Sequence, residues 1–173
     1  MKNLIYLLCI LLFVSCGADE TKEAVTEEKT APKERSIGFN TRLADLKWYL
    51  GTDAAIDVVK ELDKLWSARN YESMRPLLAD TAIFHFADGR LANSPDEFIN
   101  FLSEDESNDT WTFNVAYSVD LNPEIGGEDV MAFFTGFSVN DGDTTKTYYS
   151  ERYYIIQGKV IAWNQYTQKE KKE

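Results

Sequence analysis

Cysteine and histidine are scarce in this chain. Of its 173 residues only Cys9 and Cys16 are cysteines, and His85 is the one histidine. Cys9 lies in an apolar N-terminal stretch that we expect to be cut off, so the mature chain would keep a single cysteine. An internal disulfide, thiol catalysis and a cysteine-based metal site are then excluded. A zinc site built on several histidines is not expected either, and we expect no metal and no other cofactor.

Basic residues are also in deficit. The chain has 18 lysines and arginines against 29 acidic residues, which gives a net charge of −11. A protein that binds nucleic acid or an anionic lipid surface needs a positive face to meet the phosphate groups. Apart from the mixed terminal run KEKKE, the sequence has no basic cluster. We therefore exclude nucleic acid as a partner.

Long hydrophobic runs are missing as well. The apolar stretch Leu4–Val14 is far shorter than the roughly 20 residues that a membrane-spanning helix needs. Lys2 precedes this stretch, and the small residue Ser15 follows it, directly before Cys16. A positive start, an apolar run and a small residue at its end are the layout of a secretory signal peptide.

The segment FVSC at residues 13–16 resembles the lipobox of bacterial lipoproteins, although it begins with Phe where leucine is usual. The resemblance implies that residues 1–15 are removed and that Cys16 carries acyl chains such as palmitate, which anchor the protein without a spanning helix. Gly17 and the acidic pair Asp19–Glu20 then imply the outer membrane of a bacterial cell envelope, with display on the cell surface. A plain transmembrane anchor and a non-lipidated signal peptide cut elsewhere are the alternatives.

The rest of the chain divides into a polar segment and one domain. Residues 16–36 have no aromatic residue, little apolar content and mixed charge, so they cannot bury enough surface to fold. We interpret them as a flexible tether that holds the domain at the lipid anchor. Residues 37–168 are long enough for one domain with its own core, and residues 169–173 are expected to fray.

Helical periodicity dominates the first half of this domain. Apolar residues recur at helical spacing after Asp53, which is the expected N-cap. In the segment SPDEFINFL, Ser94 is expected to cap a later helix, with Pro95 at its first position and Glu97 completing a capping box. We predict helices over residues 53–69 and 71–78, a short strand over residues 81–86, and a helix from residue 95.

The second half of the domain is typical of β-strands. From residue 110 to residue 121 every second residue is apolar or aromatic, and we expect one face to carry Trp111, Phe113, Val115, Tyr117, Val119 and Leu121. Turn residues then separate three further predicted strands, over residues 129–139, 146–156 and 159–167. Helices followed by a four-stranded antiparallel meander predict an α+β fold.

This order of elements resembles the NTF2-like superfamily, its SnoaL-like branch in particular. The residues that carry the resemblance are VVKELDKLWSARNYESMRPLLADTAIFHFADGRLANSPDEFINFL and, near the end, YYIIQGKVIAWNQY. The resemblance implies a curved sheet that wraps around the long helix and forms a cone with an internal cavity. Members of the family include isomerases, dehydratases, cyclases and non-catalytic binding or dimerisation modules, so the fold leaves the function open.

Three polar residues near the first predicted strand are candidates for chemistry. His85 is the one side chain that would titrate near neutral pH without help, but it alternates with Phe84 and Phe86. Either the two phenylalanines fill the core and His85 is exposed, or His85 points into the cavity. Asp80 and Asp88 bracket the strand, and their positions are typical of turns and caps.

The last two strands are more suggestive of a pocket. They carry several aromatic residues, which also favour sheets for packing reasons alone. Glu151 shares a face with Tyr149 and Tyr153, and Gln165 shares a face with Trp163. Aromatic side chains mixed with a few polar groups are typical of small-molecule cavities. We predict that Tyr153, Trp163 and Gln165 bind a ligand and that a buried Glu151 has a raised pKa.

Three functions follow from these observations. The leading hypothesis is a lipid-anchored module that binds a small, mostly apolar molecule, or pairs through its sheet, without catalysis. The rival is a SnoaL-like isomerase, hydratase or cyclase with Glu151, His85 or Asp88 as general base. A structural homodimer is the third.

Overall fold

The computed structural model describes residues 38–39, 47–105, 107, 109–122, 126–140 and 142–170. The expected signal peptide, Cys16, the tether and the last three residues lie outside this part of the chain. Its strands are β1 (Gly38–Phe39), β2 (Lys47–Leu50), β3 (Leu78–His85), β4 (Leu91–Ala92), β5 (Thr110–Asn122), β6 (Gly127–Asn140), β7 (Asp143–Ile156) and β8 (Lys159–Lys169). Its helices are α2 (Asp53–Ser67), α3 (Tyr71–Met74), the 3₁₀ turn η1 (Arg75–Leu77) and α4 (Pro95–Ser103).

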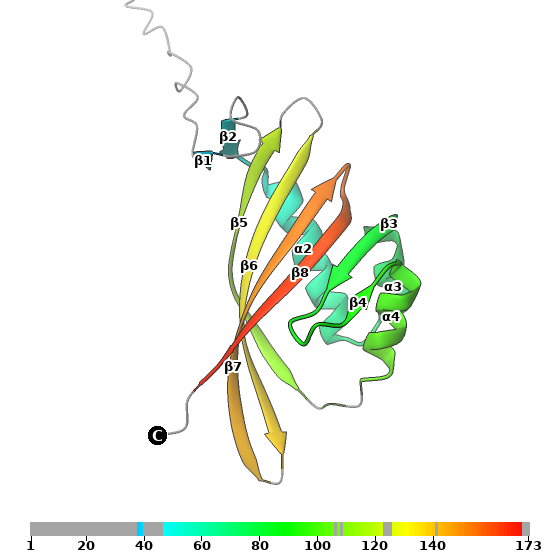
Figure 1. Ribbon diagram of the computed structural model, residues 1–173, viewed down its shortest axis with the longest axis vertical. Coiled ribbons are helices and arrows are strands. Elements are labelled where there is room, and N and C mark those ends of the chain that lie inside the picture. The colour runs from blue at the N-terminus through cyan, green and yellow to red at the C-terminus, as the bar shows by residue number, and fades with distance from the viewer. Residues whose placement is uncertain are drawn as a thin grey trace, which may run out of the picture. The chain divides into compact units, whose positions relative to one another are not determined.

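The strands form one mixed sheet in the order β1-β2-β5-β6-β7-β8-β3-β4. Strands β5 to β8 are an antiparallel meander, as predicted, and β3 then pairs in parallel with β8, with Phe84 opposite Trp163. The helices pack against this curved sheet, and α2 runs across its long strands (Figure 1). The predicted α+β fold is confirmed.

The long helix α2 begins at Asp53, as predicted, but its N-cap is a different residue. Thr52, not Asp53, is the N-cap, because the Thr52 Oγ1 accepts a hydrogen bond from the backbone N–H of Ala55 at 3.2 Å. Asp53 is instead the first helical residue, where its negative charge favours the positive end of the helix dipole. The helix ends at Ser67, close to the predicted residue 69.

The predicted helix over residues 71–78 is wrong in its second half. The α-helical hydrogen bonding stops at Met74, and a 3₁₀ turn that contains Pro76 follows. Leu78 is already the first residue of β3, where it is fully buried and pairs with Val160 of β8. The strand therefore begins three residues before the predicted Thr81.

The predicted start of α4 is confirmed. The Ser94 Oγ accepts from the backbone N–H of Glu97 at 3.1 Å, and Pro95 is the first helical residue. The Glu97 carboxylate reaches back, as expected of a capping box, but its partner is the backbone N–H of Asn93 at 2.8 Å.

Strand β5 departs from the predicted alternation. Its pairing with β6 changes register between Phe113 and Val115, which is a β-bulge. The bulge adds one residue, so the following side chains exchange faces. Val115 and Tyr117 are 55% and 50% exposed, whereas Ser118 is buried. The expectation that all the alternate residues share one face is therefore wrong beyond Phe113.

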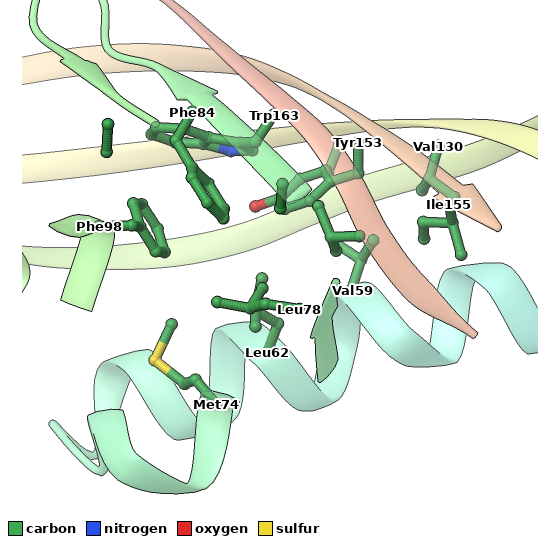
Figure 2. Packing of buried hydrophobic residues seen from close by; sticks show 14 of the residues in the cluster. Val59, Leu62, Met74, Leu78, Phe84, Phe98, Val130, Tyr153, Ile155 and Trp163 are labelled. Carbon is green, nitrogen blue, oxygen red and sulfur yellow. The ribbon is translucent and has the colours of Figure 1, made fainter. Parts of the chain in front are cut away.

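The core lies between α2, α4 and the inner face of the sheet. Val59 and Leu62 of α2 pack beside Val130, Tyr153 and Ile155 of the sheet (Figure 2). At the other end of the core, aromatic rings fill the space: Phe84 and Phe98 are stacked with centroids 4.1 Å apart, and Trp163 lies 5.5 Å from Phe98. Phe86 packs against Trp163 with centroids 5.1 Å apart, and it also lines a cavity beside the core.

Candidate functional site

A cavity of about 180 Å³ lies between α2, the end of α4, the segment after it, and the inner face of β5–β8. Its walls combine aromatic side chains with carboxylates. The lining includes Asp63, Trp66, Trp111, Tyr149, Glu151 and Gln165. A concave site with an apolar wall and a few convergent polar groups is the usual form of a small-molecule site.

Glu151 is the buried acid of this cavity. It lies on β7 and is only 6% exposed. Its Oε2 accepts hydrogen bonds from the hydroxyl of Tyr153 and from the indole Nε1 of Trp163, the latter at 3.1 Å. Its Oε1 accepts from the Gln165 Nε2 at 2.9 Å. Burial raises the pKa of Glu151, and the nearby charge of Asp63 raises it further, against the lowering effect of the three donors.

The register of two strands explains why these donors converge. Glu151 lies directly opposite Gln165 in the β7–β8 ladder, and Tyr153 lies opposite Trp163. Opposite and diagonal neighbours on one face of an antiparallel pair are close enough to touch. One inward-facing patch therefore holds the acid and all three of its donors.

Asp63 is a second acid of the cavity, and the sequence analysis did not select it. It lies on α2, and its Oδ1 accepts from the indole Nε1 of Trp111 at 2.7 Å. Burial raises the pKa of Asp63, and the hydrogen bond from Trp111 opposes that rise. A signal was present, because Val59, Leu62 and Trp66 place Asp63 on the core-facing side of the helix. A charged residue on the buried face of a helix is unusual, which makes it a candidate for a functional role.

Aromatic rings form the wall near Asp63. Trp66 and Trp111 meet edge to face with centroids 6.2 Å apart. Across the cavity, the guanidinium of Arg90 lies over the rings of Phe86 and Phe101, at 4.7 and 5.5 Å from their centroids. Aromatic rings therefore line the cavity both near Asp63 and near Arg90.

Two more acids, both exposed, line the cavity after the end of α4. Asp105 accepts from the backbone N–H of Ser107 at 2.9 Å, and the Arg69 guanidinium donates to the Ser107 carbonyl. Asp109 lines the cavity as well, and its pKa is raised by burial and by the charge of Asp105. This part of the cavity lining is therefore negatively charged.

The structure separates the predicted candidates into two groups. It brings Glu151, Tyr153, Trp163 and Gln165 into one hydrogen-bonded cluster, in which Tyr153 and Gln165 line the cavity and Trp163 is part of the core. His85 is exposed, on the face of β3 opposite the buried Phe84.

The remaining candidates are bound in surface ion pairs. Asp88 accepts from the backbone N–H of Arg90 at 2.9 Å and from its Nε at 2.7 Å. The backbone hydrogen bond is the main cause that lowers the pKa of Asp88. Asp80 is exposed and pairs with Arg75 at 2.7 Å. The geometry gives neither aspartate a place beside Glu151.

The described part of the chain holds no group of three or more histidine, cysteine, aspartate or glutamate side chains placed to bind a metal ion. Within the same residues, no helix is long and apolar enough to cross a membrane.

Comparison with known proteins identifies the fold. No protein-family model matches the chain, and no curated protein matches it in sequence. Among solved structures, it is similar to an NTF2-like protein from Burkholderia xenovorans (TM-score 0.53, 11% identity, covering 68% of this chain and 92% of that one). It is also similar to the CaMKII hub of S. rosetta (0.58, 14%, 67% and 95%) and to an LEH-like epoxide hydrolase from M. tuberculosis (0.56, 11%, 68% and 84%). The domain therefore has the NTF2-like fold that its sequence resembles.

Proposed function

We propose that this domain binds a small molecule with a mostly apolar body and one hydrogen-bonding group, and that it does so without catalysis. The observation that carries the proposal is the position of Glu151. Its carboxyl group is buried, held by three donors, and part of the cavity wall. A buried acid fixed this firmly in an aromatic cavity is suited to orient a ligand.

The carboxylate of Glu151 can accept one further hydrogen bond. A carboxylate offers about four acceptor positions. The Oε2 of Glu151 accepts from Tyr153 and Trp163, whereas its Oε1 accepts from Gln165. One position on Oε1 is therefore free to accept from a donor group of a ligand in the cavity.

The volume of the cavity limits the size of the ligand. The cavity measures about 180 Å³, and a closed apolar cavity of about 150 Å³ accepts benzene. A single ring with a short substituent is therefore the expected size. The aromatic rings of Trp66 and Trp111 would cover its flat face.

Native mass spectrometry of the full chain with a panel of single-ring compounds tests the proposal. Gly136 lines the cavity and leaves no space for a side chain beside the ring of Tyr149. We expect one-to-one complexes that Gly136→Val abolishes. The control is Thr135→Val, the neighbouring position, whose hydroxyl bonds to Asn114 instead. Failure of every compound to bind, or equal binding by the Gly136→Val variant, would contradict the proposal.

Catalysis is the second candidate, and the raised pKa of Glu151 favours it. A general base must reach the proton that it removes, and Glu151 faces the cavity in which a substrate would lie. The fold is compatible with an enzyme, because the similar protein from M. tuberculosis is an epoxide hydrolase. Exchange of ligand C–H protons in D₂O, followed by NMR, separates the two candidates. Enzyme-dependent exchange that disappears in Glu151→Gln would replace the binding proposal with an isomerase-type function.

Self-association through the outer face of the sheet is a further proposal. The bulge in β5 leaves Val115 and Tyr117 exposed there, and the Tyr117 ring lies 6.2 Å from that of Phe133. Exposed apolar residues that cluster on one face mark interaction surfaces. Light scattering should show a dimer that Tyr117→Lys converts to a monomer, with Thr112→Lys, at an exposed position before the bulge, as control. A monomeric wild-type chain would exclude this assembly.

We also propose that the chain is a lipoprotein of a bacterial outer membrane, anchored through Cys16. The signal-like segment and the lipobox-like FVSC support this proposal. Metabolic labelling with an alkyne analogue of palmitate in a Gram-negative host tests it. Label in the wild-type chain that is lost in Cys16→Ser, but kept in Cys9→Ser, is the expected result.

A further inference from the structure

The cavity contains more negative charge than the protein neutralises. Among the described residues, four carboxylates line it, those of Asp63, Asp105, Asp109 and Glu151. Within the described residues, none of the four forms an ion pair with a lysine or an arginine. Their hydrogen-bond partners are neutral groups, such as the Trp111 indole at Asp63.

Among the described residues that line the cavity, the one cation is already neutralised. Arg90 forms an ion pair with Asp88 at 2.7 Å, and its guanidinium is stacked on Phe86 and Phe101. Its charge is therefore shared with an acid outside the cavity, and it does not balance the carboxylates inside.

We propose that the ligand of this cavity is a small organic cation, a protonated amine attached to a single apolar ring. This inference rests on the proposed binding function and specifies the charge of the ligand. The ammonium group would donate to Oε1 of Glu151 and to Asp63. The ring would lie against the indoles of Trp66 and Trp111.

Asp63 supplies the second acceptor. Its Oδ1 accepts from Trp111, and among the described residues nothing donates to its Oδ2. Asp63 is only partly buried and lines the cavity, so its Oδ2 can accept from a ligand there. An ammonium group has three donors and no acceptor, which matches a site in which two carboxylate oxygens are open.

The aromatic walls favour the same ligand charge. A cation within about 6 Å of an indole face is attracted by the ring quadrupole, and the attraction grows when water is excluded. Trp66, Trp111 and Tyr149 all line the cavity together with the acids. Carboxylates combined with aromatic faces attract cations and repel anions.

Mutual repulsion of the acids supports this assignment. The charge of Asp63 raises the pKa of Glu151, and the charge of Asp105 raises the pKa of Asp109. A bound cation would relieve both repulsions, whereas a neutral ligand would relieve neither. Binding of an amine is therefore coupled to loss of protons from these acids.

Three probes of nearly equal size separate charge from shape: 2-phenylethylamine, 2-phenylethanol and phenylacetate. Calorimetry with the full chain should give a Kd for the amine at least about tenfold lower than for the alcohol, because an ion pair and a cation–π contact are added. Phenylacetate should not bind. Equal affinities for amine and alcohol would overturn the inference and leave the binding function intact. Failure of all three probes would overturn both.

Two variants test which carboxylates bind the ammonium group of the ligand. Asp63→Asn and Glu151→Gln should each reduce the preference for the amine over the alcohol by about tenfold. Asp57→Asn is the matched control, since Asp57 lies on the same helix but pairs with Lys60 at the surface. Thermal unfolding verifies that each variant is folded. If Glu151→Gln does not fold, the test is carried out with Asp63→Asn alone. An unchanged amine preference in Asp63→Asn would contradict the proposed site.

Discussion

The indole Nε1 of Trp111 lies 2.7 Å from the Oδ1 of Asp63, so a residue of β5 holds an acid of α2 in place across the cavity. The two residues are 48 positions apart in the chain. The contact joins the sheet to the long helix at the cavity wall. Among the described residues, no other group donates a hydrogen bond to this partly buried carboxylate.

Replacing Trp111 by Phe should therefore raise the pKa of Asp63. The ring is largely kept, but the donor that stabilises the charged form is lost, while the effect of burial remains. The free energy of unfolding should fall by about 1–3 kcal/mol, because a half-buried acceptor loses its hydrogen bond. Carboxyl ¹³C NMR titration measures the pKa, with Tyr148→Phe on an exposed position of β7 as control. An unchanged pKa of Asp63 would show that the contact has no electrostatic role.

Stability should depend on pH through Glu151. Its pKa lies above the usual 4.5 in the folded protein, so the folded chain keeps the proton at pH values at which the unfolded chain has lost it. The free energy of unfolding therefore decreases as the pH rises through the interval between the unfolded and the folded pKa. The raised pKa values of Asp63, Asp109 and Asp129 act in the same direction.

Glu151→Gln isolates the contribution of this residue, because glutamine does not titrate. The difference in unfolding free energy, wild type minus variant, should be largest near pH 4 and should decrease toward about pH 8. Urea unfolding at several pH values gives this difference. Parallel curves for the two proteins would mean that the pKa of Glu151 is the same in the folded and unfolded chain.

The arrangement of the elements followed from periodicity and turn residues, because each strand and helix buries one side. The helix start at Ser94 was predictable for a local reason, since cap and helix are adjacent in sequence. The bulge in β5 was not predictable, because Val115 and Tyr117 suit a strand on either face and no glycine or proline marks the extra residue. Its effect was to move both residues to the outer face.

The cluster around Glu151 was partly predictable for a different reason. Alternation along β7 places Glu151 and Tyr153 on one face, but the tight turn at Gln157–Gly158 alone does not bring Gln165 opposite Glu151. A bulge between Tyr154 and Ile155 in the β7–β8 pairing shifts the register by one residue, and this shift was not predicted. Asp63 could have been selected as a charged residue on the core-facing side of α2, but its contact with Trp111 of β5 could not, because a helix-to-sheet contact has no signal that is local in sequence. That the cluster binds a ligand stays a prediction.

Thr52 should be critical for the start of α2. Its hydroxyl caps the helix, and it also donates to the Oε1 of Glu128 at 2.9 Å, while its backbone N–H donates to the Oε2 at 2.6 Å. Thr52→Ala should reduce the free energy of unfolding by about 0.5–2 kcal/mol. Thr52→Ser keeps the oxygen and should cost much less. Equal losses in the two variants, measured by urea unfolding, would assign the effect to the methyl group.

The last prediction concerns Asp88, which lies outside the cavity but controls the charge of Arg90. Asp88→Asn removes the ion pair at 2.7 Å and leaves the guanidinium uncompensated in the cavity wall. An exposed ion pair contributes about 0.2–1 kcal/mol, so 2-phenylethylamine should bind up to about fivefold more weakly. Asp80→Asn is the matched control, because Asp80 pairs with Arg75 away from the cavity. If calorimetry shows the same change in both variants, net charge rather than Arg90 determines the affinity.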